Sequence, residues 1–209
     1  KNQPYYVDSE GSAWRCYHFI EGTVCLQTAE TPELFYASAK AFGKFQQMLS
    51  DYPAHTLYET IDKFHDTENR LALFEQALAA DTLGRAESAR SEIEFVLAHK
   101  ADYSVAMDAL RSGKLPLRVT HNDTKLNNVL IDKVSGEGIC VIDLDTVMPG
   151  LSINDFGDSI RFGANHSAED EQDLSLVNFD IDLYEVYTKG FLEGAAGAFS
   201  AAELDYMPW

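Results

Sequence analysis

The chain has 209 residues, and its 34 acidic against 16 basic side chains give it a formal charge of −18. This length is enough for one substantial hydrophobic core, or for one large lobe with a small appendage. Because so acidic a surface repels nucleic acid and anionic lipid, we expect neither as a partner. No uninterrupted apolar run reaches about 18 residues, so the sequence predicts no membrane span.

The ends of the chain and its cysteines bear on whether the sequence is a fragment and on its cellular compartment. The chain begins at Lys1 without an initiator Met or a signal peptide, so we expect a piece of a longer protein, trimmed at both ends. The three cysteines show no CxxC spacing, and Cys16 and Cys140 lie in apolar, strand-like runs where small core residues are expected. Reduced thiols and no export signal favour the cytoplasm.

The first elements predicted along the chain are two short strands. Residues 5–7 and 13–20 read as strands joined by a turn at 8–12, and the chain then leaves the sheet through Gly22. Helices are predicted from Thr31 onward, because Thr31 is a helix-capping residue type and Pro32 suits the first helical position. Apolar residues then recur at helical spacing up to Leu49.

Two further helices are predicted in the middle of the chain. The first is capped by Thr67 and places Leu71, Phe74 and Leu78 on one face. The second is longer and runs from about Ala86 to Leu110. We expect the apolar faces of both helices to pack into the core.

A β-hairpin follows these helices. Residues 117–120 read as a short strand that leads into a polar loop, and residues 128–132 read as the next strand. Residues 133–138 contain two glycines and predict a turn, after which residues 139–142 return antiparallel. This arrangement would bring Asp143 back beside Asn128.

The polar loop carries the pattern that phosphoryl transfer requires. Such chemistry needs a carboxylate aimed at the attacking hydroxyl, magnesium ions on the phosphates and a cation near the developing charge. Asp123 can be the base and Lys125 the cation, while Asn128 and Asp143 offer the hard oxygen ligands that Mg²⁺ prefers. His121 is expected to hold the loop backbone.

The specificity of this pattern comes from its context. His-x-Asp-x-x-x-x-Asn alone fixes only three positions and is more often structural or accidental than catalytic. The added Lys125, the flanking strands and Asp143 favour a phosphotransferase.

The remaining residues predict more helix. A helix is expected from about Ile153, and within it Asp158 is either an exposed carboxylate or a buried acceptor of backbone N–H groups from the polar loop. A helix over 182–193 follows, and Ser200 with Glu203 forms a capping box that opens another. The acidic run 169–173 is expected to be a solvated loop.

Two nucleotide-binding signals are absent from this sequence. It contains neither G-x-G-x-x-G nor a Walker A sequence, and no strand lysine of the kinase type can be identified. If the chain is a two-lobed kinase, the strands that cover the phosphates are expected before Lys1.

Several segments together resemble the aminoglycoside phosphotransferase/choline kinase family, and within it the N-acetylhexosamine 1-kinases most closely. The most specific of these segments are residues 121–130, 141–150 and 155–161. The likeness continues upstream through residues 14–22 and 39–46, and so covers most of the chain.

The resemblance implies an α+β, protein-kinase-like fold. Residues 1–20 would be a remnant of the N-terminal lobe sheet, and residues 23–209 a mostly helical catalytic C-terminal lobe with the catalytic hairpin. The hinge that meets the adenine of ATP would be formed by four residues: Phe19, Ile20, Glu21 and Gly22.

The resemblance also implies roles for single residues. Asp123 would be the base at the substrate hydroxyl, Asn128 and Asp143 the Mg²⁺ ligands, and Asp158 a support for the loop. Asp145 is a candidate sugar contact, against a structural role. The implied reaction is the ATP-dependent phosphorylation of the anomeric hydroxyl of N-acetylglucosamine or N-acetylgalactosamine.

Two alternatives stay open at this point. The acceptor could be an aminoglycoside, choline or another small alcohol, since an acidic cleft suits a cationic acceptor. The chain could also be a non-catalytic pseudokinase or binding module, although a scaffold would not require Asp123, Asn128 and Asp143 together. The sequence predicts no oligomeric state.

Overall fold

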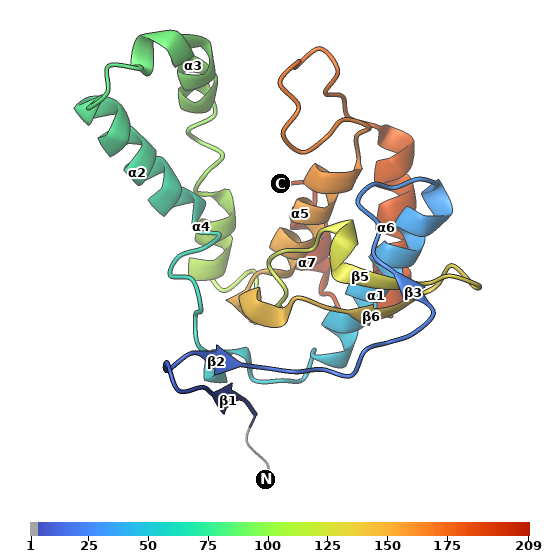
Figure 1. Cartoon of the computed structure of the whole chain (residues 1–209). Helices are drawn as coiled ribbons and strands as arrows, with labels where there is room; N and C mark the ends of the chain where they lie inside the picture. The colour runs from blue at the N-terminus through green and yellow to red at the C-terminus, as the bar shows by residue number, and fades with distance from the viewer. Residues whose placement is uncertain (1–3) are drawn as a thin grey trace.

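The computed structural model describes residues 4–209, and helices dominate it from residue 32 onward. The α-helices are α1 (Pro32–Met48), α2 (Thr67–Ala80), α3 (Arg90–Ala98), α4 (Val105–Arg111), α5 (Ser152–Gly163), α6 (Ile181–Ala195) and α7 (Ala201–Tyr206). The strands are β1 (Tyr6–Val7), β2 (Ala13–Trp14), β3 (Thr23–Val24), β4 (Arg118–Thr120), β5 (Val129–Asp132), β6 (Gly138–Val141) and β7 (Met148–Gly150). Short 3₁₀ turns cover Ala54–Thr56, Ala86–Ala89, Leu126–Asn128 and Leu144–Thr146. The chain is therefore α+β, with small sheets set among helices (Figure 1).

Helices α1 and α6 pack against each other and form the centre of the fold. Thr31 caps α1 with its side chain and Pro32 is the first helical residue, as predicted. The two helices approach closely because glycines lie at their contact, where a Cβ on Gly43 would collide with the carbonyl oxygen of Phe191 and a Cβ on Gly194 with that of Lys40.

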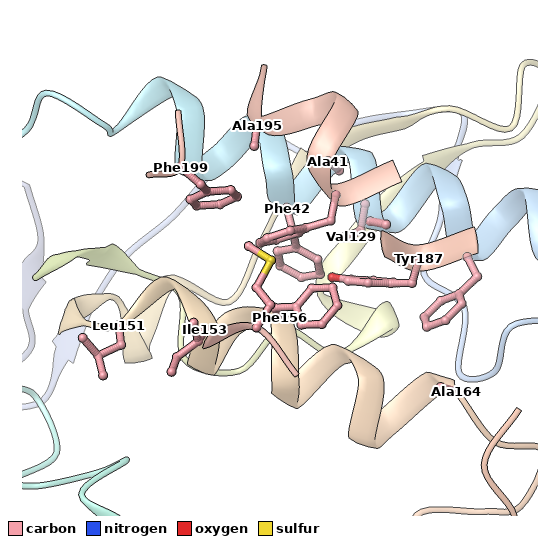
Figure 2. Packing of buried hydrophobic residues seen from close by; sticks show 14 of the residues in the cluster. Ala41, Phe42, Val129, Leu151, Ile153, Phe156, Ala164, Tyr187, Ala195 and Phe199 are labelled. Carbon is pink, nitrogen blue, oxygen red and sulfur yellow. The ribbon is translucent and has the colours of Figure 1, made fainter. Parts of the chain in front are cut away.

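The hydrophobic core lies between these two helices, α5 and the β5–β6 hairpin (Figure 2). Its largest buried side chains are aromatic: Phe35, Phe42, Phe156, Tyr187 and Phe191. The rings of Phe35 and Tyr187 are in contact, with centroids 4.8 Å apart and planes tilted by 44°. Burying aromatic rings of this size supplies most of the hydrophobic stabilisation of such a core, which fixes the position of the hairpin that carries the functional loop.

The predicted hairpin is present and is extended by a third strand. β5 pairs antiparallel with β6, and Val129 lies opposite Val141. β3 adds to the other edge of β5, giving the order β3–β5–β6. β4 lies where a strand was predicted, and it pairs antiparallel with β7, a strand that was not predicted and that contains Pro149, a residue uncommon in strands.

The middle of the chain differs from the prediction. The long helix expected from Ala86 to Leu110 is interrupted, since α3 ends at Ala98 and α4 begins at Val105. No residue of α2 or α3 is buried, and these two helices stand away from the rest of the molecule (Figure 1). The expectation that these apolar faces pack into the core is therefore wrong for α2 and α3, whereas the α4 part of the predicted helix does reach the core through Ala109.

Two smaller expectations are also corrected. Asp66, and not Thr67, caps α2 through its side chain. Cys16 is exposed and not in the core, because the second predicted strand ends at Trp14 and the β1–β2 pair is exposed throughout. Cys140 is half-buried.

The described residues also bear on membranes. Among residues 4–209, none of the helices combines the length and the apolar character needed to cross a bilayer.

Candidate functional site

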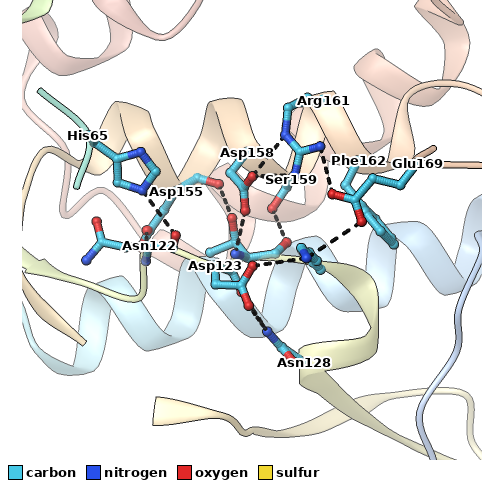
Figure 3. Close-up of polar contacts among 12 residues, drawn as sticks. His65, Asn122, Asp123, Asn128, Asp155, Asp158, Ser159, Arg161, Phe162 and Glu169 are labelled. Atoms are coloured by element: carbon cyan, nitrogen blue, oxygen red, sulfur yellow. Dashed lines mark hydrogen bonds and ion pairs between the residues drawn. The ribbon is translucent and has the colours of Figure 1, made fainter. Parts of the chain in front are cut away.

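The polar loop between β4 and β5 holds Asp123 beside Asn128. The Asn128 side-chain nitrogen Nδ2 donates to the backbone oxygen of Asp123 at 2.8 Å and to its carboxylate oxygen Oδ2 at 3.0 Å (Figure 3). Because both of these oxygens can only accept, the side-chain amide of Asn128 must direct its NH₂ group, and not its oxygen, toward Asp123. The Asp123 side chain is 29% exposed, which leaves its carboxylate accessible to a small hydroxyl.

The hairpin brings Asp143 to the same end of the sheet as Asn128. The backbone N–H of Ile142 donates to the backbone oxygen of Asn128 at 2.9 Å, so Asp143 is the next residue beyond this contact. Asp143 is exposed and has a left-handed backbone, with φ 59° and ψ 60°. A non-glycine residue in this region is uncommon, and here it turns the chain out of β6 directly into the 3₁₀ turn Leu144–Thr146.

The available donor atoms fit a magnesium ion that also binds phosphates. Because Asn128 uses Nδ2 toward Asp123, its oxygen Oδ1 is left without a hydrogen-bond donor among residues 4–209. Within the same residues, the Asp143 carboxylate has no hydrogen bond or ion pair. No group of three His, Cys, Asp or Glu side chains suited to a metal lies in the described residues. Asn128 Oδ1 and the Asp143 carboxylate are donors of the hard oxygen type that Mg²⁺ takes, and such an ion shares the rest of its coordination with phosphate and water.

His121 connects the loop to the strand that precedes Asp143. It is fully buried, and its Nε2 donates to the backbone oxygen of Ile142 at 2.9 Å. Its Nδ1 accepts the backbone N–H of Asp123 at 3.3 Å. A carbonyl can only accept and an N–H can only donate, so these two contacts define a neutral imidazole with its proton on Nε2. The ring lies edge-on to Phe42 and Phe45.

Helix α5 holds the loop through Asp155, whose part the sequence analysis did not foresee. The buried carboxylate accepts the backbone N–H groups of His121 at 2.9 Å and Asn122 at 2.8 Å. It also accepts the side-chain Nε2 of Gln46 at 2.5 Å. Burial raises the pKa of Asp155, and the two backbone hydrogen bonds oppose this shift. One sequence feature could have indicated this contact. Asp155 lies three residues before Asp158, so the two carboxylates lie on the same face of the helix.

A second group of contacts from α5 reaches Thr124. The backbone N–H of Thr124 donates to the Asp158 carboxylate at 2.8 Å, the arrangement considered for Asp158 from the sequence. The Ser159 hydroxyl donates to the Thr124 backbone oxygen at 2.6 Å and receives the hydroxyl of Tyr187 at 2.6 Å. Burial raises the pKa of Tyr187, which keeps this hydroxyl a donor. Helix α5 therefore holds both the backbone N–H and the backbone oxygen of Thr124.

Asn122 and His65 add contacts that the sequence analysis also missed. Asn122 has a left-handed backbone, φ 67°, which asparagine tolerates better than most residues. Its Nδ2 donates to the backbone oxygen of Thr146 at 2.9 Å, and His65 Nε2 lies 3.1 Å from the Asn122 backbone oxygen. No sequence motif marks His65, because its contact depends only on the tertiary fold.

Lys125 lies between two carboxylates. Its Nζ is 3.6 Å from Asp123 Oδ1 and 3.6 Å from Glu169 Oε2. Glu169 belongs to the acidic run expected to be a solvated loop, but here it also pairs with Arg161 at 3.0 Å. Arg161 in turn binds Asp158 at 2.9 Å (Figure 3).

The other predicted contact residues lie outside the polar loop. Asp145, two residues after Asp143, forms an exposed ion pair with Arg15. Phe19 is 88% exposed and Ile20 is half-buried, while Gly22 has φ 74° and its backbone oxygen accepts the N–H of Lys133 at 2.9 Å. Of the expected hinge residues, Gly22 therefore contacts the turn of the hairpin, and β3 then runs along β5 toward the loop.

A comparison with protein families agrees with this geometry. The model of a family described as "Phosphotransferase enzyme family" matches residues 4–188, which includes the loop, the hairpin, α5 and most of α6.

Proposed function

Because the chain belongs to the phosphotransferase enzyme family, we propose that it is an ATP-dependent kinase that phosphorylates the anomeric hydroxyl of an N-acetylhexosamine, giving the sugar 1-phosphate. The family is one of small-molecule phosphotransferases with a protein-kinase-like fold, and it implies ATP as the phosphoryl donor, typically with Mg²⁺. The choice of an N-acetylhexosamine rests on the sequence resemblance alone. Cytoplasmic localisation stays a prediction.

One observation carries the assignment of the reaction. Asp123, Asn128 and Asp143 come from separate positions in the chain, and the loop and hairpin bring them to one end of the β3–β5–β6 sheet. The loop is fixed through backbone contacts with Asp155 and Asp158. A site that depends on positioning and electrostatics benefits from such rigidity, and phosphoryl transfer is chemistry of that kind.

The roles follow from the contacts of each side chain. Asp123 would accept the proton of the sugar hydroxyl as its oxygen attacks the γ-phosphorus in line. Lys125 would lie near the charge that develops on the transferred group. Asn128 Oδ1 and the Asp143 carboxylate would hold Mg²⁺, which when bound neutralises phosphate charge.

The position of the predicted hinge relative to Asn128 is consistent with ATP lying along the hairpin. Gly22 lies at the turn of the hairpin and Asn128 at its opposite end, separated by the four residues of β5, about 13 Å. An adenine at residues 19–22 would leave the phosphates to reach toward Asn128 and Asp143. Asp145 is a candidate sugar contact. To bind the sugar, its carboxylate would first have to break its ion pair with Arg15.

A panel of acceptors tests the proposal with the full-length enzyme. ATP turnover is measured with N-acetylglucosamine, N-acetylgalactosamine, an aminoglycoside and choline, and we expect turnover with the sugars. The formal charge of −18 favours a cationic acceptor as the second candidate. Turnover with the aminoglycoside or choline and none with either sugar would reject the sugar assignment.

The base assignment needs a separate variant in the same assay. Asp123→Asn keeps the size of the side chain but cannot take up the proton, so kcat should fall by about 10²- to 10⁴-fold. Asp170→Asn, at an exposed acid of the loop after α5, is the matched control and should keep wild-type kcat. Undiminished turnover by Asp123→Asn would exclude Asp123 as the base, and no turnover by the wild type with any acceptor would favour a non-catalytic role.

A further inference from the structure

We infer that Glu169 is a positioning residue that holds Lys125 in place for phosphoryl transfer, an inference that rests on the proposed function. Glu169 lies in the segment between α5 and α6, 44 residues after Lys125 in the sequence. Nothing in the motifs around Asp123 or Asp143 points to it. The inference depends on a chain of polar contacts that begins and ends in the catalytic loop (Figure 3).

The first part of this chain leads from the loop backbone to Glu169. The Thr124 N–H donates to Asp158 Oδ2 at 2.8 Å, and Asp158 Oδ1 accepts Arg161 Nη2 at 2.9 Å. Arg161 Nη1 then donates to Glu169 Oε1 at 3.0 Å. Because Arg161 bridges the two carboxylates, the position of Glu169 is set by the same helix that fixes the loop.

The second part leads from Glu169 back to the proposed base. The other carboxylate oxygen of Glu169, Oε2, is 3.6 Å from Lys125 Nζ, and Lys125 Nζ is 3.6 Å from Asp123 Oδ1. The two distances are equal, so Lys125 is shared between the carboxylates and makes a direct hydrogen bond to neither. Glu169 is therefore the group that opposes the attraction of Lys125 to Asp123.

This balance has a consequence for catalysis. Without the charge of Glu169, the attraction to Asp123 is unopposed and Lys125 should move onto the carboxylate that has to receive the substrate proton. The cation would then be displaced from the transferred group, and one oxygen of the base would be occupied. A displacement of about 1 Å at a reacting centre can reduce the rate by up to about 100-fold.

The effect should appear in kcat and not in substrate binding. Lys125 is proposed to stabilise charge that develops in the transition state, so its displacement removes an interaction that the ground state does not make. We expect Glu169→Gln to lower kcat by about 10-fold and to leave the KM of the acceptor within about two-fold. Glu169→Ala should give the same loss, because the missing feature is the charge.

The neighbouring acid provides the control. Asp170 is exposed and, among residues 4–209, makes no side-chain hydrogen bond or ion pair, so Asp170→Asn removes one negative charge from the same loop without touching the contact chain. It should keep wild-type kcat. A loss in Asp170→Asn as large as that in Glu169→Gln would assign the effect to the net charge of the loop and overturn the inference.

A double-mutant cycle with Lys125→Met separates positioning of Lys125 from a general effect on the loop. If Glu169 acts through Lys125, Glu169→Gln should lower kcat in the wild-type background and leave the already reduced kcat of Lys125→Met unchanged. An equal loss in both backgrounds, or a kcat of Glu169→Gln within two-fold of wild type, would overturn the inference. Failure of the proposed function is distinct, because it is measured on the wild-type enzyme alone, as no turnover with either N-acetylhexosamine.

Discussion

Asp155 shows how a single buried carboxylate can define the shape of a functional loop. The two backbone N–H groups that it accepts, from His121 and Asn122, point inward at the position where the chain turns from β4 into the loop. Buried N–H groups without a partner are costly, and the left-handed backbone of Asn122 adds to the need for an acceptor at this position. Asp155 supplies that acceptor, so the Asp123 carboxylate is not needed for it.

Asp155→Asn tests this role. The amide has one oxygen, so in either orientation its NH₂ group faces a backbone N–H, of His121 or of Asn122, and one of the two hydrogen bonds is lost. We expect the free energy of unfolding to fall by about 1–3 kcal/mol in urea denaturation, together with kcat. Asp170→Asn should change neither quantity, and a fully stable Asp155→Asn protein would mean that the loop does not depend on this carboxylate.

At the scale of elements, the pairing of α1 with α6 positions everything that carries the site. α1 supplies Gln46 to Asp155 and the rings that pack on His121, while α6 supplies Tyr187 to Ser159. The two helices can approach this closely because Gly43 and Gly194 face the opposite backbone.

A pair of glycine-to-alanine variants tests the close approach of these helices. In Gly43→Ala the new methyl group would meet the Phe191 backbone oxygen and lie 2.8 Å from the Ala195 nitrogen, so we expect a loss of about 1–3 kcal/mol in the free energy of unfolding. Gly157 lies in α5 with no atom within 4 Å of its Cβ position, so Gly157→Ala should stabilise by up to about 1 kcal/mol. Equal stability of the two variants in thermal and urea denaturation would rule out a tight contact at Gly43.

The sequence predicted those elements whose determinants are local. The cap at Thr31, the capping box at Ser200 and the turn between β5 and β6 depend on residues within a few positions, and all three are present. The break between α3 and α4 was missed because residues 99–104 contain neither glycine nor proline. The contacts of Asp155, His65 and Glu169 were missed because they join residues more than 30 positions apart. The roles of the predicted site residues stay predictions.

Over the whole molecule, acidic side chains outnumber basic ones by about two to one. The formal charge of −18 disfavours the compact state through self-repulsion, but some of the positive side chains pair with acids of other elements. Arg161 joins α5 to the loop that follows it, and Arg118 joins β4 to α7 through Glu203.

Glu203 makes this arrangement sensitive to pH. Only 1% of its side chain is exposed, and it accepts hydrogen bonds from Arg118, from Ser152 at 2.7 Å and from the backbone of Ser200 at 2.9 Å. Burial alone would raise the pKa of Glu203, but these hydrogen bonds, chiefly that of Arg118, outweigh it and hold the pKa below its ordinary value of 4.5. Since the folded pKa is depressed, the stabilisation is fully present above pH 4.5 and is lost as the pH falls through the folded pKa.

Comparison of the wild type with Glu203→Gln across pH measures this contribution directly. Near pH 7 the variant should be less stable by about 3–5 kcal/mol in urea denaturation, because Arg118 loses its partner at a buried site. The difference should stay constant down to about pH 5.5 and shrink below pH 4.5, where the wild-type carboxylate also becomes neutral. Because both proteins share the remaining acidic groups, most of the self-repulsion cancels in the difference. A difference that stayed constant from pH 7 to pH 3 would show that the charge of Glu203 does not join α7 to the rest of the fold.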